Sequence, residues 1–279
     1  MSKSRILLSA LALILCAPTA LAQGPASNLD SAKNLFFALP VEVDVDSGAA
    51  NGDAIILRLM PLYSFPVSDA WKLVNLDLVT IADAPGGRPG QPGNPTPEPG
   101  ERALGIGDLI HASFATPNET EDFVWGVGAM ISIPIASEGQ LGSGKWSAGP
   151  AARFAYKKGE WSFGAFGGQQ WSFAGDDERN DVSQLMVRAL IRRPLPGNWH
   201  FVSAPIITAN WNASRGQRWQ VPLGGGFGRR FNFGAYPWAW SAQAYYNVIK
   251  PDGAPNWVVR LAIVAAIPYT DDQARPNSF

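Results

Sequence analysis

The segment WSFGAFGGQQWSF, at positions 161–173, has large aromatic residues at both ends of what reads as one β-strand. Trp161 and Trp171 share one parity, so on a strand both point to the same face. They lie about 33 Å apart along a strand, at about 3.3 Å per residue. Tilted by about 40°, that strand rises roughly 25 Å, the height of the apolar band between the two aromatic girdles of an outer-membrane barrel.

Period-two alternation recurs along the chain, and this is the sequence signature of such a barrel. It is clear in LFFALPVEVDVD (35–46), SQLMVRALIRR (183–193), WAWSAQAYYNV (238–248) and WVVRLAIVAAI (257–267). Further candidate strands lie near 54–63, 71–82, 105–116, 123–135, 146–156, 198–211 and 218–231. Together these segments predict an all-β fold, a transmembrane up-and-down antiparallel barrel of about twelve strands, an even number as bacterial barrels have.

One residue of segment 161–173 departs from this pattern. Gln169 has the parity of the two tryptophans, and an amide that faces lipid is unfavourable. A β-bulge at Gly167-Gly168 would reset the alternation and turn Gln169 inward. We therefore expect a bulge there.

The first residues have the three parts of a secretory signal peptide. Lys3 and Arg5 supply a positive start, Ile6 to Leu15 an apolar core, and Ala20-Leu21-Ala22 a small-x-small cleavage site. We expect a signal peptide over 1–22. The only cysteine of the chain lies within it, so no disulfide is expected after cleavage.

The composition agrees with an exported membrane barrel. Charged residues make up 16% of the chain and the net charge is −1, which gives no basic excess for nucleic acid. Glycine (29) and proline (23) are abundant, as in chains built from strands and turns. After the signal segment there is no apolar run of about 18 residues, so spanning helices are excluded.

The connections between candidate strands alternate between short and long. KKGE, LPGN and NFG predict periplasmic turns, and SEGQLGSGK, AGDDERND, NASRGQ and KPDGAPN predict external loops. In the longest connection, 85–100, eleven of sixteen residues are Pro or Gly, which predicts a mobile external loop. We expect one barrel domain over 34–269, after a periplasmic segment (23–33) and before a C-terminal tail (270–279) that ends in Phe279.

Charged residues on the strands indicate which face is inside. A lipid-facing Arg at mid-membrane costs about 2–4 kcal/mol, so charged side chains should point into the lumen. Parity then predicts a lumen with both signs of charge, which orients polar solutes and narrows the pore. The lumen and transport candidates are Glu42, Asp44, Asp46, Arg58, Asp77, Arg188, Arg192 and Arg260.

Two glycine-rich segments come close to nucleotide-binding motifs. GQLGSGKW (139–146) lacks the final Ser or Thr of the phosphate-binding loop, and no helix is expected after it. GGGFGRR (224–230) lacks the strand-to-helix context of a dinucleotide fold, and glycine in a barrel strand allows bending or leaves space. The two histidines have no carboxylate or thiol at ligand spacing, so we expect neither a metal nor a cofactor.

His111 and Ser113 form the only arrangement that points to catalysis. Two residues apart on a strand, they face the same side, where the imidazole could activate the hydroxyl. Outer-membrane phospholipase A has a His and a Ser at this spacing. Here the sequence identifies no third residue to orient the imidazole, so an ordinary polar pair is the preferred interpretation.

Several segments resemble a family of Gram-negative outer-membrane proteins that is grouped with the MetA-pathway of phenol degradation proteins and often labelled neuromedin U or transporter. They include LGIGDLIHASFATP, VWGVGAMISIPIASEGQLGSGKWSAGP, GQQWSFAGDDERNDVSQ, SAPIITANWNA, WQVPLGGGFGRRF and AYYNVIKPDG. The resemblance covers roughly 34–269. It implies an outer-membrane barrel with a transport role and supplies no catalytic motif.

Three functions are therefore open. The first is a passive channel or transporter for small solutes, with aromatic or hydrophobic compounds implied by the family label. The second is a lipid-modifying enzyme that uses His111 and Ser113. The third is a structural barrel closed by cross-lumen ion pairs that acts through its external loops. In each case the expected location is the Gram-negative outer membrane, and the expected partners are its lipid and its assembly machinery.

Overall fold

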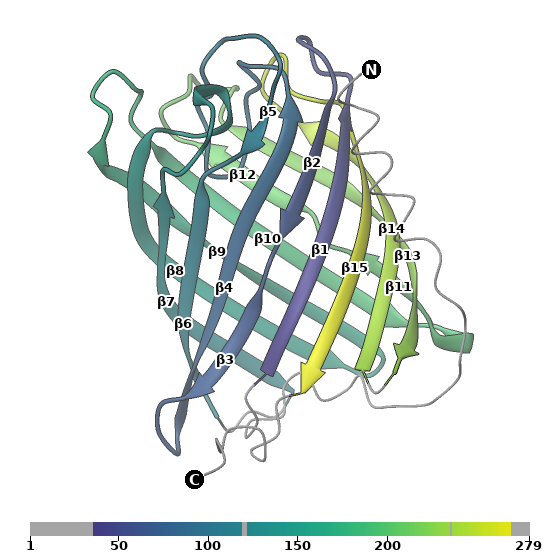
Figure 1. Ribbon diagram of the computed structural model, residues 1–279. Coiled ribbons are helices and arrows are strands. Elements are labelled where there is room, and N and C mark those ends of the chain that lie inside the picture. The colour runs from purple at the N-terminus through teal and green to yellow at the C-terminus, as the bar shows by residue number, and fades with distance from the viewer. Residues whose placement is uncertain (1–35, 119–121, 235, 269–279) are drawn as a thin grey trace, which may run out of the picture.

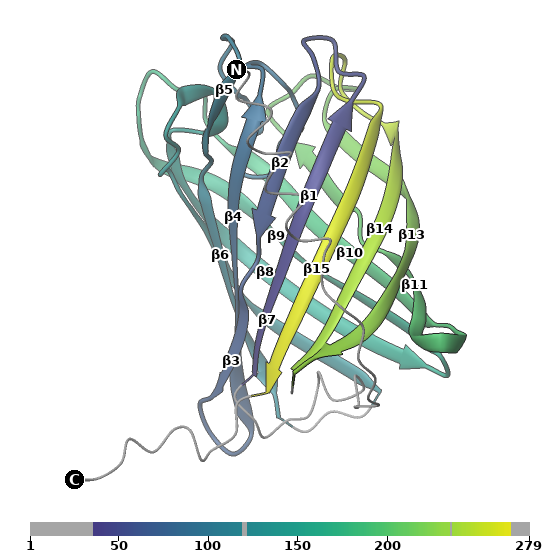
Figure 2. The same cartoon turned by 45° about the vertical axis from the view of Figure 1, so that its right-hand side comes forward.

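The computed structural model describes residues 36–118, 122–234 and 236–268 of the chain. They form one closed antiparallel β-barrel (Figures 1 and 2). The predicted signal peptide, N-terminal segment and C-terminal tail, with Phe279, lie outside the described residues and stay predictions.

Fifteen strand segments and two short 3₁₀ helices make up this part of the chain. The strands are β1 (Phe36–Ser47), β2 (Ala54–Leu59), β3 (Leu62–Pro66), β4 (Trp71–Ala84), β5 (Ala103–Ile106), β6 (Leu109–Pro117), β7 (Phe123–Ile133), β8 (Lys145–Lys158), β9 (Trp161–Gly175), β10 (Ser183–Pro194), β11 (Trp199–Ser203), β12 (Ile206–Asn210), β13 (Trp219–Phe233), β14 (Tyr236–Ile249) and β15 (Trp257–Pro268). The 3₁₀ helices η1 (Gly139–Leu141) and η2 (Pro196–Asn198) lie in connections.

The wall of the barrel has twelve strands, because three of them are each built from two segments. β2 and β3 both pair with β1 and β4, β5 and β6 both pair with β4, and β11 and β12 both pair with β10 and β13. β15 pairs with β1 from Phe36↔Pro268 to Ser47↔Trp257 and closes the ring. The predicted all-β barrel of about twelve strands is confirmed.

The three two-segment strands are interrupted at residues that disturb the hydrogen bonds between strands. Two interruptions contain a proline, and the third contains an aspartate that accepts hydrogen bonds from a connection. Pro61 and Pro205 have no N–H group and lie between β2 and β3 and between β11 and β12. Asp108, between β5 and β6, accepts hydrogen bonds from Ser143 N at 2.7 Å and from Ser143 Oγ at 2.7 Å. This contact ties the wall to the connection that contains η1.

The outer face of the barrel is apolar, with aromatic residues at both rims. Trp161 and Trp171 lie at opposite ends of β9 and are both exposed, as their spacing predicts. At one rim Trp211 packs edge-to-face on Trp219, with ring centroids 5.5 Å apart. Similar pairs recur at both ends, including Trp71–Trp125, Trp199–Trp240 and Tyr246–Trp257. This is the exterior of an outer-membrane β-barrel.

The prediction of a β-bulge at Gly167-Gly168 is wrong. β9 keeps an unbroken register with β10 through Gly167 and Gly168, and the only shift against β8 lies near Phe173. Gln169 therefore faces outward, where its Oε1 accepts a hydrogen bond from Trp211 Nε1 at 2.6 Å. Because a neighbouring indole satisfies the amide, the strand does not need to turn it inward.

The connections gather at two ends, as the sequence predicts. Among the described residues, the short-turn end holds 67–70, 159–160 and 195–198, and the long-loop end holds 48–53, 85–102, 134–144, 176–182, 211–218 and 250–256. Within the described ranges, no helix is long and apolar enough to cross a membrane.

Candidate functional site in the barrel lumen

A network of buried charges crosses the lumen near its middle. Asp44 of β1 lies opposite Arg260 of β15, and Arg260 donates from Nε to Oδ1 at 2.7 Å and from Nη2 to Oδ2 at 2.8 Å. Arg58 of β2 also donates to Asp44. All three side chains are less than a tenth exposed. A carboxylate with two guanidinium partners is an arrangement that offsets the cost of burial.

The network extends across the barrel from β1 to β10. Arg188 of β10 donates to both oxygens of Glu42, with Nη1 to Oε2 at 3.0 Å. Arg260 lies 3.3 Å from the same carboxylate. β1 and β10 are separated by several strands on each side of the ring, so this ion pair bridges the lumen.

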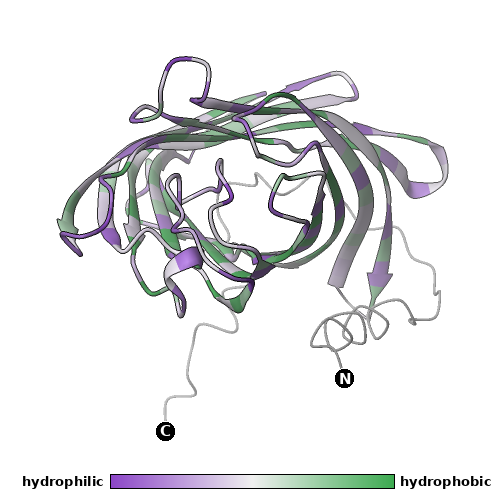
Figure 3. Ribbon diagram, turned by 90° about the horizontal axis from the view of Figure 1, so that it is seen from above, coloured by the Kyte–Doolittle hydropathy of each residue, from purple (hydrophilic) through white to green (hydrophobic). Residues whose placement is uncertain are grey.

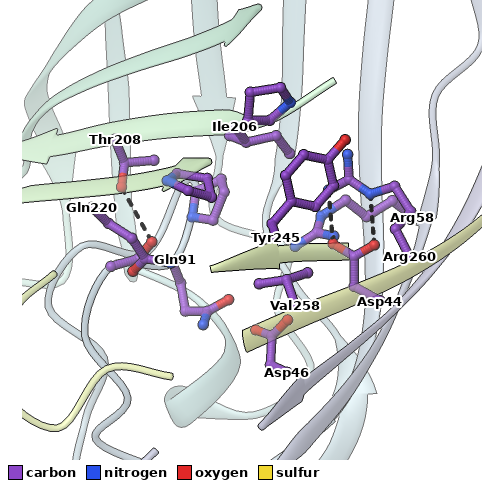
Figure 4. Close-up of a pocket in the computed structure, with 14 residues that line it drawn as sticks. Asp44, Asp46, Arg58, Gln91, Ile206, Thr208, Gln220, Tyr245, Val258 and Arg260 are labelled. Atoms are coloured by element: carbon purple, nitrogen blue, oxygen red, sulfur yellow. Dashed lines mark hydrogen bonds and ion pairs between the residues drawn. The ribbon is translucent and has the colours of Figure 1, made fainter. Parts of the chain in front are cut away.

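The interrupted strand β11/β12 supplies the third anchor of the network. Arg260 Nη1 donates to Ala204 O at 2.7 Å, and Ala204 N donates to Tyr245 Oη at 2.7 Å. The guanidinium of Arg260 also lies over the Tyr245 ring (Figure 4). The free volume beside these groups is about 30 Å³, room for only about two water molecules.

The longest connection folds into the barrel and covers this cavity from the long-loop end. Arg88 pairs with Asp46 at 3.0 Å, and both are buried. Gln184 of β10 accepts from Gly93 N at 2.9 Å and donates to Gln91 O at 3.0 Å. Figure 3 shows loop segments inside the ring of strands. We call residues 85–102 the plug.

The expectation that 85–100 projects outward as an external loop is therefore wrong. The segment starts and ends at the long-loop end, as predicted, but its polar backbone is satisfied by lumen side chains. Thr208 donates to Gly90 O at 3.3 Å and Asn210 to Pro95 O at 3.3 Å. Proline and glycine rule out a helix or strand here and still allow an irregular segment whose carbonyls point at the wall.

One part of the lumen is apolar. A cluster of buried side chains extends from β4, β6 and β7 across to β10 and includes Met60, Leu76, Leu78, Ile110, Ala112, Phe114, Met130, Ala151 and Met186. Leu62, Phe166 and Ile206 pack against it. We call these twelve residues the apolar layer. It is not predicted by the simple rule of apolar outside and polar inside. It contains every methionine of the described residues, and methionine fills irregular space because its side chain is flexible.

The structure places the predicted lumen residues as follows. Glu42, Asp44, Asp46, Arg58, Arg188 and Arg260 are buried inside the barrel. Arg192 also faces inward, near the short-turn end, beside His200 and Arg230. Their role towards solutes is not settled by this placement and stays a prediction.

The prediction that Asp77 faces the lumen is wrong. Its neighbours Leu76 and Leu78 belong to the apolar layer, so Asp77 points outward, where its Oδ1 lies 2.7 Å from His111 Nδ1. The carboxylate also bonds to the Tyr63 hydroxyl. A charged side chain on the lipid-facing side is tolerated here because two neighbouring polar groups satisfy it.

Sequence reasoning missed two members of the network. Arg88 was missed because it lies in the Pro/Gly-rich segment. It is the arginine that pairs with Asp46, the carboxylate of β1 that no arginine of the described wall holds. Tyr245 belongs to the alternating segment 238–248, but its place in the network was missed, because its contact with Ala204 depends on the interruption of a distant strand.

A wide, open depression lies at the long-loop end between the plug and the turns 48–53 and 250–256. Its volume is about 410 Å³, and Pro89, Pro95 and Pro97 line part of it. It would admit a small solute as far as the plug. Among the described residues no cluster of His, Cys, Asp or Glu could hold a metal ion.

Comparisons with known proteins support the fold. No family model matches the chain, and no curated protein matches it. The COG4313 outer membrane channel from Pseudomonas putida F1 is similar in structure, with TM-score 0.57, 14% identity, and coverage of 91% of this chain and 100% of that chain. At this identity the likeness shows an outer-membrane barrel fold, and the finer family resemblance stays a prediction.

Two further solved structures are weaker likenesses. The translocator domain of the autotransporter NalP from Neisseria meningitidis has TM-score 0.42 and 9% identity, over 95% of this chain and 94% of that one. A Pseudomonas aeruginosa FadL homologue has TM-score 0.40 and 9% identity, over 85% and 91%.

Proposed function

We propose that this chain is an outer-membrane channel for small hydrophobic or aromatic solutes, closed in the conformation described. The observation that carries the proposal is the apolar layer inside the lumen. Apolar side chains there serve no contact with lipid, and they give a surface that a hydrophobic solute can displace or follow. The solved structure of similar fold is by name an outer membrane channel.

The cross-lumen ion pairs alone would fit a closed structural barrel equally well. Size favours the channel, since an eight-stranded barrel can already be filled by side chains and this wall has twelve strands. Its extra space is filled by the plug, a segment held mainly by single hydrogen bonds and by three ion pairs, Arg88–Asp46, Glu98–Arg179 and Arg102–Asp83. Such a segment can leave the lumen without unfolding the wall.

The proposal is tested by single-channel recording in planar bilayers. We compare the wild-type barrel with a variant in which 88–98 is replaced by a short Gly-Ser turn. The wild type should show rare openings and the variant frequent, discrete steps. A folded variant that never conducts would reject the channel and favour a structural barrel.

Solute preference is tested separately in liposomes loaded with the shortened barrel. Uptake of a labelled monoaromatic hydrocarbon should exceed uptake of a sugar of similar volume. In Met130→Gln, which places an amide in the apolar layer, that advantage should fall. Equal uptake of both solutes in all forms would exclude the hydrophobic preference while leaving the channel itself intact.

A second candidate function, acyl-ester cleavage, is favoured by one observation. The structure supplies the third residue that the sequence did not identify, because Asp77 holds Nδ1 of His111 and leaves Nε2 free to take the proton of Ser113. Asn75, directly across from Ser113, is buried, and its Nδ2 has no partner among the described residues. Such a donor could stabilise an oxyanion.

Two features count against this candidate. No hydrogen bond joins His111 and Ser113 in the described structure. Asp77 lies six residues from Trp71, so it sits roughly 15 Å from that rim at a tilt of about 40°, deeper than lipid ester bonds. Esterase assays in micelles should show no difference between wild type, Ser113→Ala and Asp77→Asn. Activity that both substitutions abolish would establish the enzyme.

A further inference from the structure

A cluster of cationic and imidazole groups lies inside the barrel near the short-turn end. Arg192 of β10, His200 of β11 and Arg230 of β13 belong to strands that neighbour one another in the wall. His200 is directly opposite Gly228, and Arg230 follows two residues later on the same face. Arg192 is directly opposite Val202, two residues from His200. Diagonal neighbours of this kind are about 7–8 Å apart, within reach of arginine side chains.

All three side chains face the lumen. His200 is only 4% exposed, and its ring lies so close to Gly228 that a methyl group there would meet it at 2.7 Å. Arg192 has the parity of Gln184 and Arg188, which contact the plug and the central network. The adjacent residues Arg193 and Arg229 have the opposite parity and are exposed, and Arg193 pairs with Glu160 on the outside of the barrel.

This cluster differs from the central network because it has no carboxylate. Arg58, Arg188 and Arg260 each hold Glu42 or Asp44, whereas no ion pair among the described residues includes Arg192 or Arg230. The two guanidinium groups carry like charges that repel each other, and both lie near enough to His200 to interact electrostatically with its ring. His200 Nδ1 and Arg230 Nε are buried without a hydrogen-bond partner.

Unpaired cations that repel one another in a partly buried site are costly unless an anion binds between them. Guanidinium groups bind carboxylate, sulfonate and phosphate through paired, charge-assisted hydrogen bonds. The side chain of Leu190, two residues before Arg192 on the same face, is 41% exposed. It lies on β10 between the cluster and the apolar layer, so an apolar surface leads away from the cations.

We propose that Arg192, His200 and Arg230 form an anion-binding site in the lumen for an amphipathic solute, with its acidic group between the arginines and its apolar body against Leu190. This rests on the proposed channel and names one substrate class more closely, as hydrophobic solutes that carry a carboxylate on an aromatic or aliphatic body. The site binds and releases the solute through hydrogen bonds and ion pairs, and no covalent bond is made or broken.

The test is isothermal titration calorimetry on the detergent-solubilised barrel, with benzoate, benzyl alcohol and acetate as probes. Benzoate should bind the wild type more tightly than either of the others, because only benzoate offers both an anion and an aromatic ring. In Arg192→Gln/Arg230→Gln the benzoate affinity should fall at least tenfold.

The matched control is Arg193→Gln/Arg229→Gln, which removes the same charge from the same two strands on the outward face. It should bind benzoate like the wild type. If both double variants lost the same benzoate affinity, overall charge would explain the binding and the site would be rejected. If neither lost affinity, the two lumen arginines would play no part and the site would be rejected as well.

A measurement of ion selectivity distinguishes failure of the anion-binding site from failure of the proposed channel. In the plug-shortened barrel, a KCl gradient should give a reversal potential on the anion-preferring side, and Arg192→Gln/Arg230→Gln should shift it towards cations. Discrete openings without such a shift would keep the channel and reject the anion site. If no barrel conducts, calorimetry still decides whether the site exists.

Discussion

Removing Arg188 tests whether the centre of the lumen is a dry network of ion pairs or a hydrated path. Arg188→Ala takes away two hydrogen bonds from Glu42, which is 4% exposed. Breaking a buried pair from one side costs about 3–5 kcal/mol. Because Arg260 still lies 3.3 Å from Glu42, we expect the lower end of that range, about 3 kcal/mol.

The assay is equilibrium unfolding in urea and detergent, followed by tryptophan fluorescence and checked for reversibility. The matched control is Glu42→Gln/Arg188→Met, which removes both charges and keeps most of the volume. Its stability should stay within about 1 kcal/mol of wild type, since Arg58 and Arg260 both still pair with Asp44. If Arg188→Ala loses less than about 0.5 kcal/mol, water already screens Glu42. The network would then be a hydrated path, and conductance should change its ion preference instead.

Three further outcomes test the plug, the wall and the rim. Arg88→Ala should raise the open probability in planar bilayers several-fold, because Asp46 is the ion-pair partner that holds this part of the plug, and an unchanged open probability would mean that other contacts hold it. Gly226→Ala should destabilise the barrel by about 1–3 kcal/mol, since its Cβ would lie 1.9 Å from Ala242 O. Gly164→Ala, at 3.1 Å from the nearest atom, should cost less in the same urea titration, and the reverse order would contradict the close approach. Trp211→Phe should cost about 1–2 kcal/mol by removing the donor to Gln169 Oε1, whereas Gln169→Leu/Trp211→Phe should recover most of the loss.

The sequence was sufficient for the wall of the barrel because each strand carries its own signal. Alternation along β1, β10, β14 and β15 depends only on neighbours in the chain and on the two-residue period of a strand. The spacing of Trp161 and Trp171 is likewise local, fixed by the thickness of the membrane. These features determined the strand number, the outward face and the two ends at which connections gather.

Parity arguments failed where a side chain finds a partner on another strand. Gln169 and Asp77 were expected to avoid lipid, by a bulge and by facing the lumen. Both point outward, because Trp211 and His111 satisfy them there. The direction of a polar side chain is decided by the full set of partners around it, and that set is a property of the register between strands.

The contents of the lumen were decided by tertiary structure alone. Whether Arg188 meets Glu42 depends on the ring closing at twelve strands, which brings residues 146 positions apart into contact. Whether 85–102 projects or folds inward depends on lumen acceptors such as Gln184, which no local pattern reveals. The sequence by itself determined a membrane barrel and which strand faces are apolar, because lipid acts on each strand independently. Only the closed ring decided which charges pair, which stay free and what fills the interior, because those energies depend on distances across the lumen.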